Sequence, residues 1–166
     1  MKLQFYILLI IVAILMSSCD SEKFNLPDNA NTFLTKDSSK TWKLAKRYND
    51  SYRMNMGDCF LSYRVTYNTD GTTTDNNGSN TDCGQSLNVN WSFYSNENGA
   101  YIKLKGDQIK TLMHIENDYK FLKIKDLSDT LMIVSFRHKQ FGNKERIIED
   151  YLVPEDFEVE GRNYHN

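Results

Sequence analysis

The residues that most often carry out catalysis are scattered along this chain. His114, His138 and His165 lie far apart, and none has a histidine or cysteine at the spacing that metal sites use. The chain also contains no Gly-x-Ser-x-Gly motif, phosphate-binding loop or dinucleotide-binding fingerprint. We therefore expect each histidine to be a surface or strand residue, and we predict neither enzyme activity nor a cofactor.

One polar segment brings several oxygen ligands together in the sequence. Its candidate ligands are Asp70, Asp75, Asn77, Ser79 and Asp82. Calcium accepts carboxylate and amide oxygens, but the segment lacks the later acidic residue that completes an EF-hand. Because Asn, Gly, Ser and Asp are also the usual residues of a solvated loop, we predict an exposed loop over residues 75–86, with calcium binding as the alternative.

The N-terminal residues are typical of an export signal. Lys2 precedes an apolar run over residues 5–16, and two serines and Cys19 follow. As a helix the run would span roughly 18 Å, which is short of the ~30 Å hydrocarbon core of a bilayer. We therefore predict a signal peptide over residues 1–18 rather than a permanent transmembrane helix.

Residues 15–19, Leu-Met-Ser-Ser-Cys, resemble the lipobox of bacterial lipoproteins. The resemblance implies cleavage before Cys19 and a lipid on its thiol, and two or three acyl chains would hold the protein on a membrane. An ordinary secretory signal with an incidental cysteine is the alternative. We expect a lipid-anchored protein of the cell envelope, in the outer membrane, facing either the periplasm or the cell surface.

Two cysteines remain once Cys19 is assigned to the lipid. An exported chain folds in an oxidising compartment, so we predict a disulfide between Cys59 and Cys83. It would close a loop of about 25 residues and contribute roughly 3 kcal/mol in the chain-entropy model. Zinc is the competing use of the thiols, but neither has a cysteine or histidine at ligand spacing.

The charge of the chain gives no reason to expect nucleic acid as a partner. The formal net charge is −2 at pH 7, and the basic residues are scattered. A nucleic-acid-binding domain carries a basic face or stripe. For the same reason we expect the lipid, and not a basic surface, to hold the protein on its membrane.

Alternating apolar and polar residues predict short strands separated by turns. The predicted strands are residues 41–48, 59–67, 72–74, 87–94, 101–105, 109–115, 119–127, 130–136 and 146–153. One helical turn is predicted at residues 34–39. Short connections make successive strands antiparallel neighbours, and closure pairs both edges of the sheet. We therefore predict an all-β, antiparallel up-and-down barrel of about eight to nine strands.

The predicted domain boundaries follow from these elements. We assign the tether to residues 19–37, the barrel to residues 38–153 and a C-terminal tail to residues 154–166. The strand at 130–136 is apolar on both sides, so its outer side needs a cover. We expect the tail to pack there, across the outside of the barrel near Met132 and Val134.

Several motifs, in this order, resemble the lipocalin-like domain of bacterial envelope lipoproteins. They are residues 40–44 (Lys-Thr-Trp-Lys-Leu), Cys59 before an aromatic strand, residues 67–72 (Tyr-Asn-Thr-Asp-Gly-Thr), Cys83, residues 90–93 (Asn-Trp-Ser-Phe), and the later Ile124, Leu127 and Leu131. The resemblance covers residues 40–136. The Gly-x-Trp of the longer lipocalins is absent, and residues 146–166 extend beyond the part that matches.

This resemblance implies a barrel that can enclose a cavity, but no particular ligand. We predict a small apolar ligand, because binding cavities are lined mainly by apolar and aromatic side chains. The candidate binding residues are Trp42, Tyr63, Tyr67, Trp91 and Phe93. The alternative is a tethered protein-interaction module, an inhibitor or immunity-type partner of another envelope protein, with a filled barrel. A cavity of ~300 Å³ or more would favour the ligand.

Overall fold

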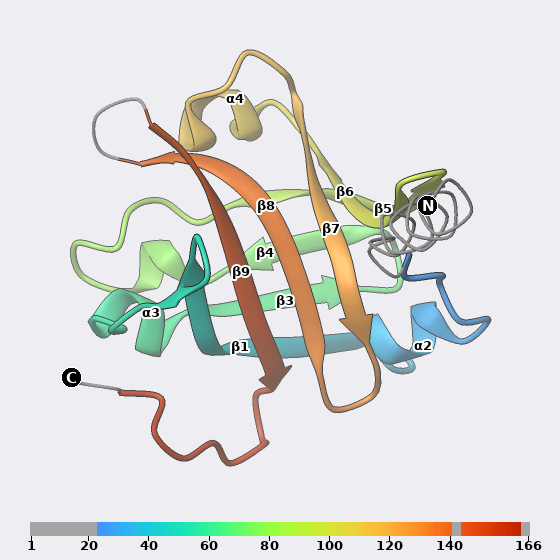
Figure 1. Ribbon diagram of the computed structural model, residues 1–166, viewed down its shortest axis with the longest axis horizontal. Coiled ribbons are helices and arrows are strands. Elements are labelled where there is room, and N and C mark those ends of the chain that lie inside the picture. The colour runs from blue at the N-terminus through green and yellow to red at the C-terminus, as the bar shows by residue number, and fades with distance from the viewer. Residues whose placement is uncertain (1–22, 141–143, 164–166) are drawn as a thin grey trace, which may run out of the picture.

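The computed structural model describes residues 23–140 and 144–163, which form a closed antiparallel β-barrel (Figure 1). The predicted signal peptide and Cys19 lie outside the described residues. Within residues 23–140 and 144–163, no helix is both long enough and apolar enough to cross a bilayer.

The strands follow one another around the barrel. They are β1 (Ser39–Asn49), β2 (Tyr52–Arg53), β3 (Arg64–Asn68), β4 (Thr72–Asp75), β5 (Asn88–Asn96), β6 (Gly99–Lys105), β7 (Tyr119–Leu127), β8 (Met132–Gln140) and β9 (Lys144–Pro154). Their order in the sheet is β2-β1-β3-β4-β5-β6-β7-β8-β9, and every pairing is antiparallel. Because β1 also pairs with β9, the sheet closes, and β2 extends one end of β1. This arrangement confirms the predicted fold class.

The helices are short and lie between the strands. They are α2 (Ala30–Thr35), α3 (Asp58–Ser62), the 3₁₀ helix η1 (Asn77–Ser79) and α4 (Gln108–Met113). The prediction of a strand at residues 109–115 was wrong. Ile109, Leu112 and Met113 repeat at the i, i+3, i+4 spacing of a helix and pack on the core. Alternation over so few residues could not distinguish a strand from this helical face.

Most strand limits differ from the prediction by a few residues, and two of these differences concern helices. The segment predicted as a strand from residue 59 begins with α3, and the strand itself starts at Arg64. Phe60 and Leu61 donate their N–H groups to the carbonyl of Gly57, which starts the helical turn before β3. The helical turn predicted at residues 34–39 lies earlier, in α2, because β1 already begins at Ser39.

One end of the barrel is closed by α2. The indole Nε1 of Trp42, a fully buried residue of β1, donates to the carbonyl of Leu34 at 3.0 Å. Lys40 is 3% exposed and donates to the carbonyls of Phe33 at 2.9 Å and Asp129 at 2.6 Å. A buried ammonium requires such partners, so these contacts hold α2 and the β7–β8 turn against β1. Figure 1 shows α2 at this end, where β7 finishes.

Two β-bulges change which side chains face the interior. The pairing of β1 with β9 shifts register between Leu44 and Lys46, so Leu44 and Arg47 both point into the barrel. Strict alternation would have placed Arg47 outside. The pairing of β7 with β8 shifts in the same way after Ile124, and Leu127 therefore faces inward as well.

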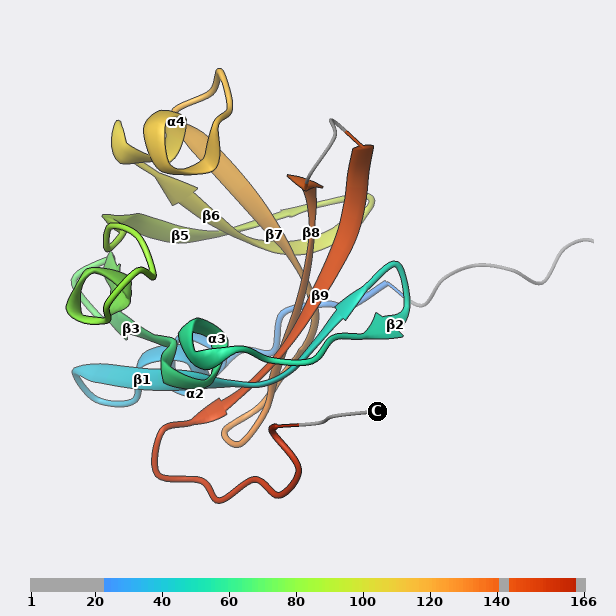
Figure 2. The ribbon, with the colours of Figure 1, turned by 90° about the vertical axis from the view of Figure 1, so that its left-hand side faces the viewer.

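The predicted position of the C-terminal segment was wrong. Met132 and Val134 point into the barrel, where they are 1% and 3% exposed, so they need no outer cover. The segment after β9 instead runs along the side of the barrel formed by β1 (Figure 2). Glu155 donates its N–H to the carbonyl of Thr41, and the Arg162 guanidinium donates to the carbonyl of Leu44 at 2.9 Å.

Candidate functional site

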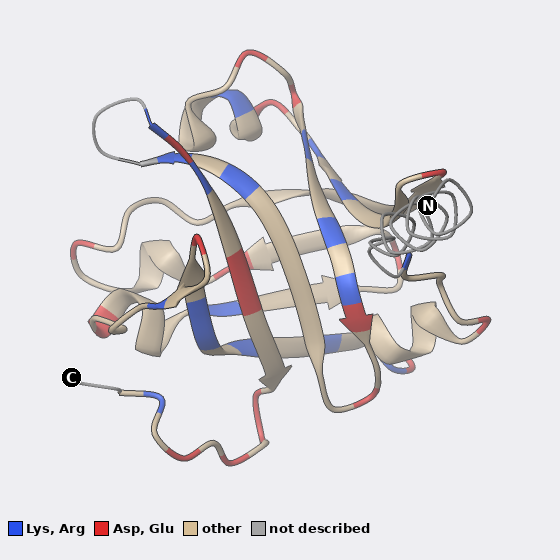
Figure 3. Cartoon of the chain, viewed as in Figure 1, with Lys and Arg blue, Asp and Glu red and all other residues tan. Residues whose placement is uncertain are grey.

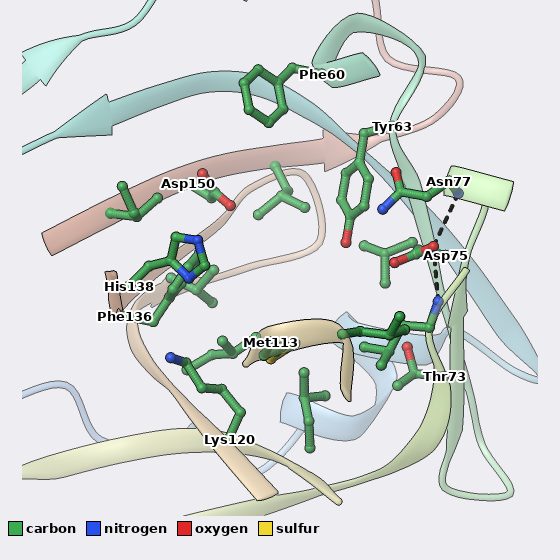
Figure 4. Close-up of a pocket in the computed structure, with 18 of the residues that line it drawn as sticks. Phe60, Tyr63, Thr73, Asp75, Asn77, Met113, Lys120, Phe136, His138 and Asp150 are labelled. Carbon is green, nitrogen blue, oxygen red and sulfur yellow. Dashed lines mark hydrogen bonds between the residues drawn. The ribbon is translucent and has the colours of Figure 1, made fainter. Parts of the chain in front are cut away.

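The barrel encloses a cavity of about 490 Å³ toward the end opposite α2. The apolar part of its wall comes from most of the strands, and from α3 and α4 at the rim. It includes Phe60, Val65, Leu104, Met113, Leu122, Val134, Phe136 and Ile148 (Figure 4). The other end is filled by Trp42 and Leu34, so the cavity is closed at its base and bordered by loops at its mouth.

A charged pair stands in this largely apolar wall. Arg47 and Asp150 form a two-point ion pair, with Nε–Oδ1 and Nη2–Oδ2 distances of 2.6 Å. The Arg47 guanidinium also lies 4.5 Å from the centre of the Phe60 ring. Burial alone would lower the pKa of Arg47, but the hydrogen bonds and charge of Asp150 raise it above its ordinary value. Arg47 therefore keeps its positive charge, and the two-point contact with Asp150 supplies its counter-charge.

Two tyrosines contribute hydroxyl groups to the cavity. Burial raises the pKa of Tyr63 well above its ordinary value, and the carboxylate of Asp75 raises it further. Burial also raises the pKa of Tyr67. Within the described part of the chain, neither hydroxyl has a hydrogen-bond partner. Both hydroxyls stay protonated at neutral pH and are available to donate to a polar atom in the cavity.

Asp75 holds the polar loop that forms one side of the mouth. Its Oδ1 accepts the N–H groups of Asn77 at 3.0 Å and Leu87 at 3.2 Å, the two bonds drawn in Figure 4. Burial raises the pKa of Asp75, although these N–H groups and the Ser86 hydroxyl favour the charged form. The carboxyl thus ties the start of the loop to its end, where β5 begins.

Two basic side chains lie on the opposite side of the cavity. Lys120 of β7 and His138 of β8 both line it (Figure 4). Burial lowers the pKa of Lys120. Burial likewise lowers the pKa of His138, and the positive charges of Lys120 and Arg47 lower it further. His138 is therefore neutral at pH 7 and has one nitrogen that can accept a hydrogen bond.

The predicted disulfide between Cys59 and Cys83 is confirmed, and both cysteines border the cavity. It joins α3 to the loop after η1. Asn76, just before η1, adds polar contacts nearby. It accepts from the N–H of Arg64, the first residue of β3, at 2.7 Å and donates to the carbonyl of Ser62, the last residue of α3, at 2.9 Å. These bonds fix one part of the mouth.

The five predicted binding residues separate into two groups. Tyr63 and Tyr67 line the cavity. Trp42, Trp91 and Phe93 do not line it. Trp42 packs beneath α2 at the closed end, and Trp91 lies edge-on between Tyr67 and Phe93, with ring centres 5.8 and 5.4 Å away. Trp42 therefore supports the closed end of the barrel, and Trp91 supports the ring of Tyr67.

Sequence reasoning missed the charged residues of the cavity. Arg47 and Asp150 lie on strands that were predicted, but Arg47 is brought inside by the bulge in β1. Lys120 and His138 do sit at inward positions of alternating strands. The signal available for them was a basic residue at an apolar position of the alternating pattern.

The alternative of a calcium site is not supported by the arrangement of the polar loop. Asp70 lies in the turn before β4 and accepts from Thr72, whereas Asp75 lies at the far end of that strand. Across residues 23–140 and 144–163, no three His, Cys, Asp or Glu side chains gather as metal ligands would.

Comparison with known proteins gives only distant likenesses. No protein-family model and no curated protein matches this chain. Among solved structures, a lipocalin-like protein from Bacteroides uniformis has a TM-score of 0.44 and 13% identity, covering 69% of this chain and 94% of that one. Bovine odorant-binding protein, in a complex with a selenium-containing odorant, has a TM-score of 0.38 and 12% identity, covering 84% and 80%. The barrel assignment therefore rests on the strand pairing itself.

Proposed function

We propose that this protein is a lipid-anchored binding protein of the cell envelope whose barrel holds a small apolar ligand. The observation that carries the proposal is the cavity of about 490 Å³. Ligand sites in proteins are concave, largely apolar and roughly 300–1,000 Å³ in volume. The proposed anchor is the lipid on Cys19 that the lipobox resemblance implies.

The cavity also weighs against the alternative of a protein-interaction module with a filled barrel. A filled barrel of this size would interlock its inward side chains, because protein interiors are close-packed. Here the inward side chains of Leu104, Leu122 and Val134 instead border open space. Ligand binding accounts for that space, whereas the interaction module does not require it.

The polar groups indicate which apolar molecules would fit. The hydroxyls of Tyr63 and Tyr67 can donate hydrogen bonds, and the Lys120 ammonium lies on the opposite side of the cavity. A buried donor without a partner costs about 1–3 kcal/mol. We therefore propose a ligand with an apolar body and at least one hydrogen-bond acceptor, such as a carbonyl or ether oxygen.

Titration with N-phenyl-1-naphthylamine, an uncharged dye that fluoresces in apolar surroundings, tests whether the cavity is used. We expect saturable binding of one dye per chain. Leu122→Trp would fill part of the cavity and should weaken dye binding at least tenfold. Phe121→Trp is the matched control, because the neighbouring side chain points outward and dye binding should be unchanged.

Two outcomes would contradict the proposal. One is dye binding that is equally strong in Leu122→Trp, which would place the dye outside the cavity. The other is the absence of saturable binding by the unaltered chain. Thermal unfolding of both variants shows whether they fold. If Leu122→Trp does not fold, Val134→Met is a smaller substitution that also fills part of the cavity. Mass spectrometry of the mature N-terminus tests the lipid on Cys19 separately.

A further inference from the structure

The outer surface of β5, β6 and β7 carries a cluster of aromatic rings. Tyr94 of β5 pairs with Tyr101 of β6, and Phe121 and Tyr119 follow on β7. Ring centres in this cluster are 5.2 Å apart for Tyr94 and Phe121, and 5.4 Å apart for Tyr119 and Phe121. Tyr94 is 44% exposed. Three of the four rings carry a hydroxyl, so the cluster is amphipathic rather than purely apolar.

Lysines occupy the outward positions beside these rings. Lys103 pairs with Phe121, Lys105 pairs with Tyr119, and Lys123 pairs with Tyr101. The Lys103 ammonium lies 5.1 Å from the centre of the Tyr119 ring and 5.7 Å from that of Phe121. We call the surface formed by Tyr94, Tyr101, Tyr119, Phe121, Lys103, Lys105 and Lys123 the lysine–tyrosine face.

The charge of this face differs from that of the whole chain. The chain has a formal net charge of −2, yet Asp126, near the end of β7, is the single acidic residue in these three strands. Figure 3 shows blue bands along β7 and red at its end. We expected no basic surface for anionic lipid, because the lysines are scattered in the sequence. The alternation and pairing of the strands nevertheless gather three of them on this face.

The N-terminal tether reaches the domain on this face. A Cβ built on Gly99 would point outward between Lys123 Cε at 3.5 Å, the Phe24 carbonyl at 3.8 Å and Lys23 Cγ at 4.0 Å. Gly99 occupies an outward position of β6, two residues before Tyr101. Residues 23–24 therefore lie beside Gly99 and near Lys123, at the edge of the lysine–tyrosine face.

The length of the tether limits how far this face can be from the proposed anchor. Cys19 lies four residues before Lys23 in the sequence. An extended chain spans at most about 3.6 Å per residue, or about 14 Å over this distance. A lipid on Cys19 therefore holds the Gly99 corner of the barrel within about 14 Å of the bilayer surface.

We propose that the lysine–tyrosine face lies on an anionic lipid bilayer and sets the orientation of the barrel on the membrane. Tyrosine rings favour the interface between headgroups and acyl chains, where the ring is buried and the hydroxyl stays hydrated. The lysine ammonium groups bind headgroup phosphates, while their methylene stems lie along the rings. The position of the anchor rests on the proposed function, whereas the chemistry of the face does not.

Another basic outer surface, on β1 and β3, is already covered. Lys43 of β1 and Arg64 of β3 also point outward, but the C-terminal segment lies over them. Lys43 donates to the carbonyl of Glu155 at 2.8 Å, and Arg64 forms an ion pair with the Glu155 carboxylate at 3.1 Å. The β1–β3 side is therefore covered by the chain itself, and the lysine–tyrosine face is the better surface for anionic lipid.

Lipid quenching of single fluorophores on the full chain tests the orientation. The chain is reconstituted in vesicles of phosphatidylcholine and phosphatidylglycerol that contain a nitroxide-labelled headgroup. One label is placed on the lysine–tyrosine side through Asn90→Cys, an exposed outward position paired with Lys105. The control label is placed on β9 through Ile147→Cys, which is 47% exposed. We expect several-fold stronger quenching at position 90 than at position 147.

Charge reversal tests the role of the lysines. The triple variant Lys103→Glu, Lys105→Glu, Lys123→Glu should abolish the difference between the two labels. It should also weaken binding of this face to the anionic bilayer roughly 100-fold, since each lysine near an anionic surface contributes about 1 kcal/mol, or about fivefold. The matched control reverses Lys46, Lys139 and Lys144, which lie outside β5–β7, and should leave the difference unchanged.

Equal quenching at both positions, or stronger quenching at position 147, would overturn the proposal. The proposal would also be overturned if the label at position 90 were shielded from solvent in native envelopes but not in vesicles. That result would indicate a protein partner on this face. Failure of the anchor is seen separately, because an unmodified Cys19 appears in the N-terminal mass. The quenching difference is measured on vesicle-bound chains, so it does not depend on whether a lipid on Cys19 holds the N-terminus at the membrane.

Discussion

Arg47 and Asp150 show how a charged pair can be part of an apolar cavity wall. Their side chains are 16% and 7% exposed, and each has the other as its counter-charge. Removing one partner from a buried pair leaves an uncompensated charge, which costs more than the pair contributes when it is intact. Replacing both partners with apolar residues avoids that cost.

We expect Arg47→Met alone to lower the free energy of unfolding by roughly 3 kcal/mol, because the Asp150 carboxylate would stay buried without a partner. The double variant Arg47→Met, Asp150→Leu should lose much less. Urea unfolding of the two variants and the unaltered chain checks this. A double variant that is less stable than Arg47→Met would show that the pair is needed for more than its charge balance.

Asp75 gives a prediction that depends on pH. Burial raises the pKa of its carboxyl, so the folded state disfavours the charged form relative to the unfolded chain. The stability from this group is complete below the unfolded pKa of about 3.9 and is lost as the pH rises through the folded pKa. An asparagine keeps an Oδ1 that can accept from Asn77 and Leu87, but carries no charge.

We therefore expect Asp75→Asn to raise the melting temperature at pH 7 by about 1 to 2 °C, the size expected of about 0.5 kcal/mol in a domain of this length. The gain should disappear near pH 3, where the aspartic acid is protonated as well. Thermal unfolding at both pH values checks this, with Asp82→Asn in the exposed loop as the control. A gain of equal size at both pH values would rule out the charge as its cause.

Among the elements, α3 and the loop after η1 depend on each other. The bond between Cys59 and Cys83 spans a sequence separation of 24 residues, and Asn76, just before η1, adds hydrogen bonds to the end of α3 and the start of β3. Both cysteines border the mouth of the cavity. The disulfide therefore acts on the stability of the chain and on the shape of the site at the same time.

We expect the double variant Cys59→Ser, Cys83→Ser to lose roughly 3 kcal/mol of unfolding free energy in the chain-entropy model. The melting temperature should fall by roughly 6 to 12 °C. Dye binding should weaken as well, because the wall at α3 is no longer held against the loop. A variant with reduced stability but unchanged dye affinity would show that the disulfide does not shape the mouth.

At the scale of the whole molecule, the C-terminal segment supports the barrel seam between β1 and β9. Arg162 donates to the carbonyls of Leu44 at 2.9 Å and Leu61 at 2.8 Å, so it links β1 to α3. The N–H of Glu155 continues the pairing at Thr41. These contacts lie at the place where the last strand meets the first.

We expect truncation after Pro154 to lower the melting temperature by roughly 3 to 6 °C, because about 1 to 2 kcal/mol of hydrogen bonding is removed. Arg162→Ala should reproduce part of this effect. Since the segment does not line the cavity, dye binding by the truncated chain should be unchanged below its melting temperature. An unchanged melting temperature would mean that these hydrogen bonds contribute no net stability.

The sequence by itself determined the class of the fold and the disulfide bond. Alternation at Val65, Tyr67, Val89 and Trp91 correctly identified buried faces of strands, because successive side chains on a strand point to opposite sides. The predicted export signal and the number of cysteines were enough to pair Cys59 with Cys83. The first result depends on local alternation and the second on the number of cysteines. Neither requires information on which strands are neighbours in the sheet.

Only the tertiary structure decided which residues form the site and which surface is basic. Trp42 and Tyr63 were equally good candidates in sequence, but Trp42 lies at the closed end of the barrel and Tyr63 at the cavity. The bulge in β1 turned Arg47 inward, and strand pairing brought Lys103 beside Phe121. Height along a barrel, local register shifts and cross-strand neighbours are set by contacts between distant segments, so no pattern within one strand contains them.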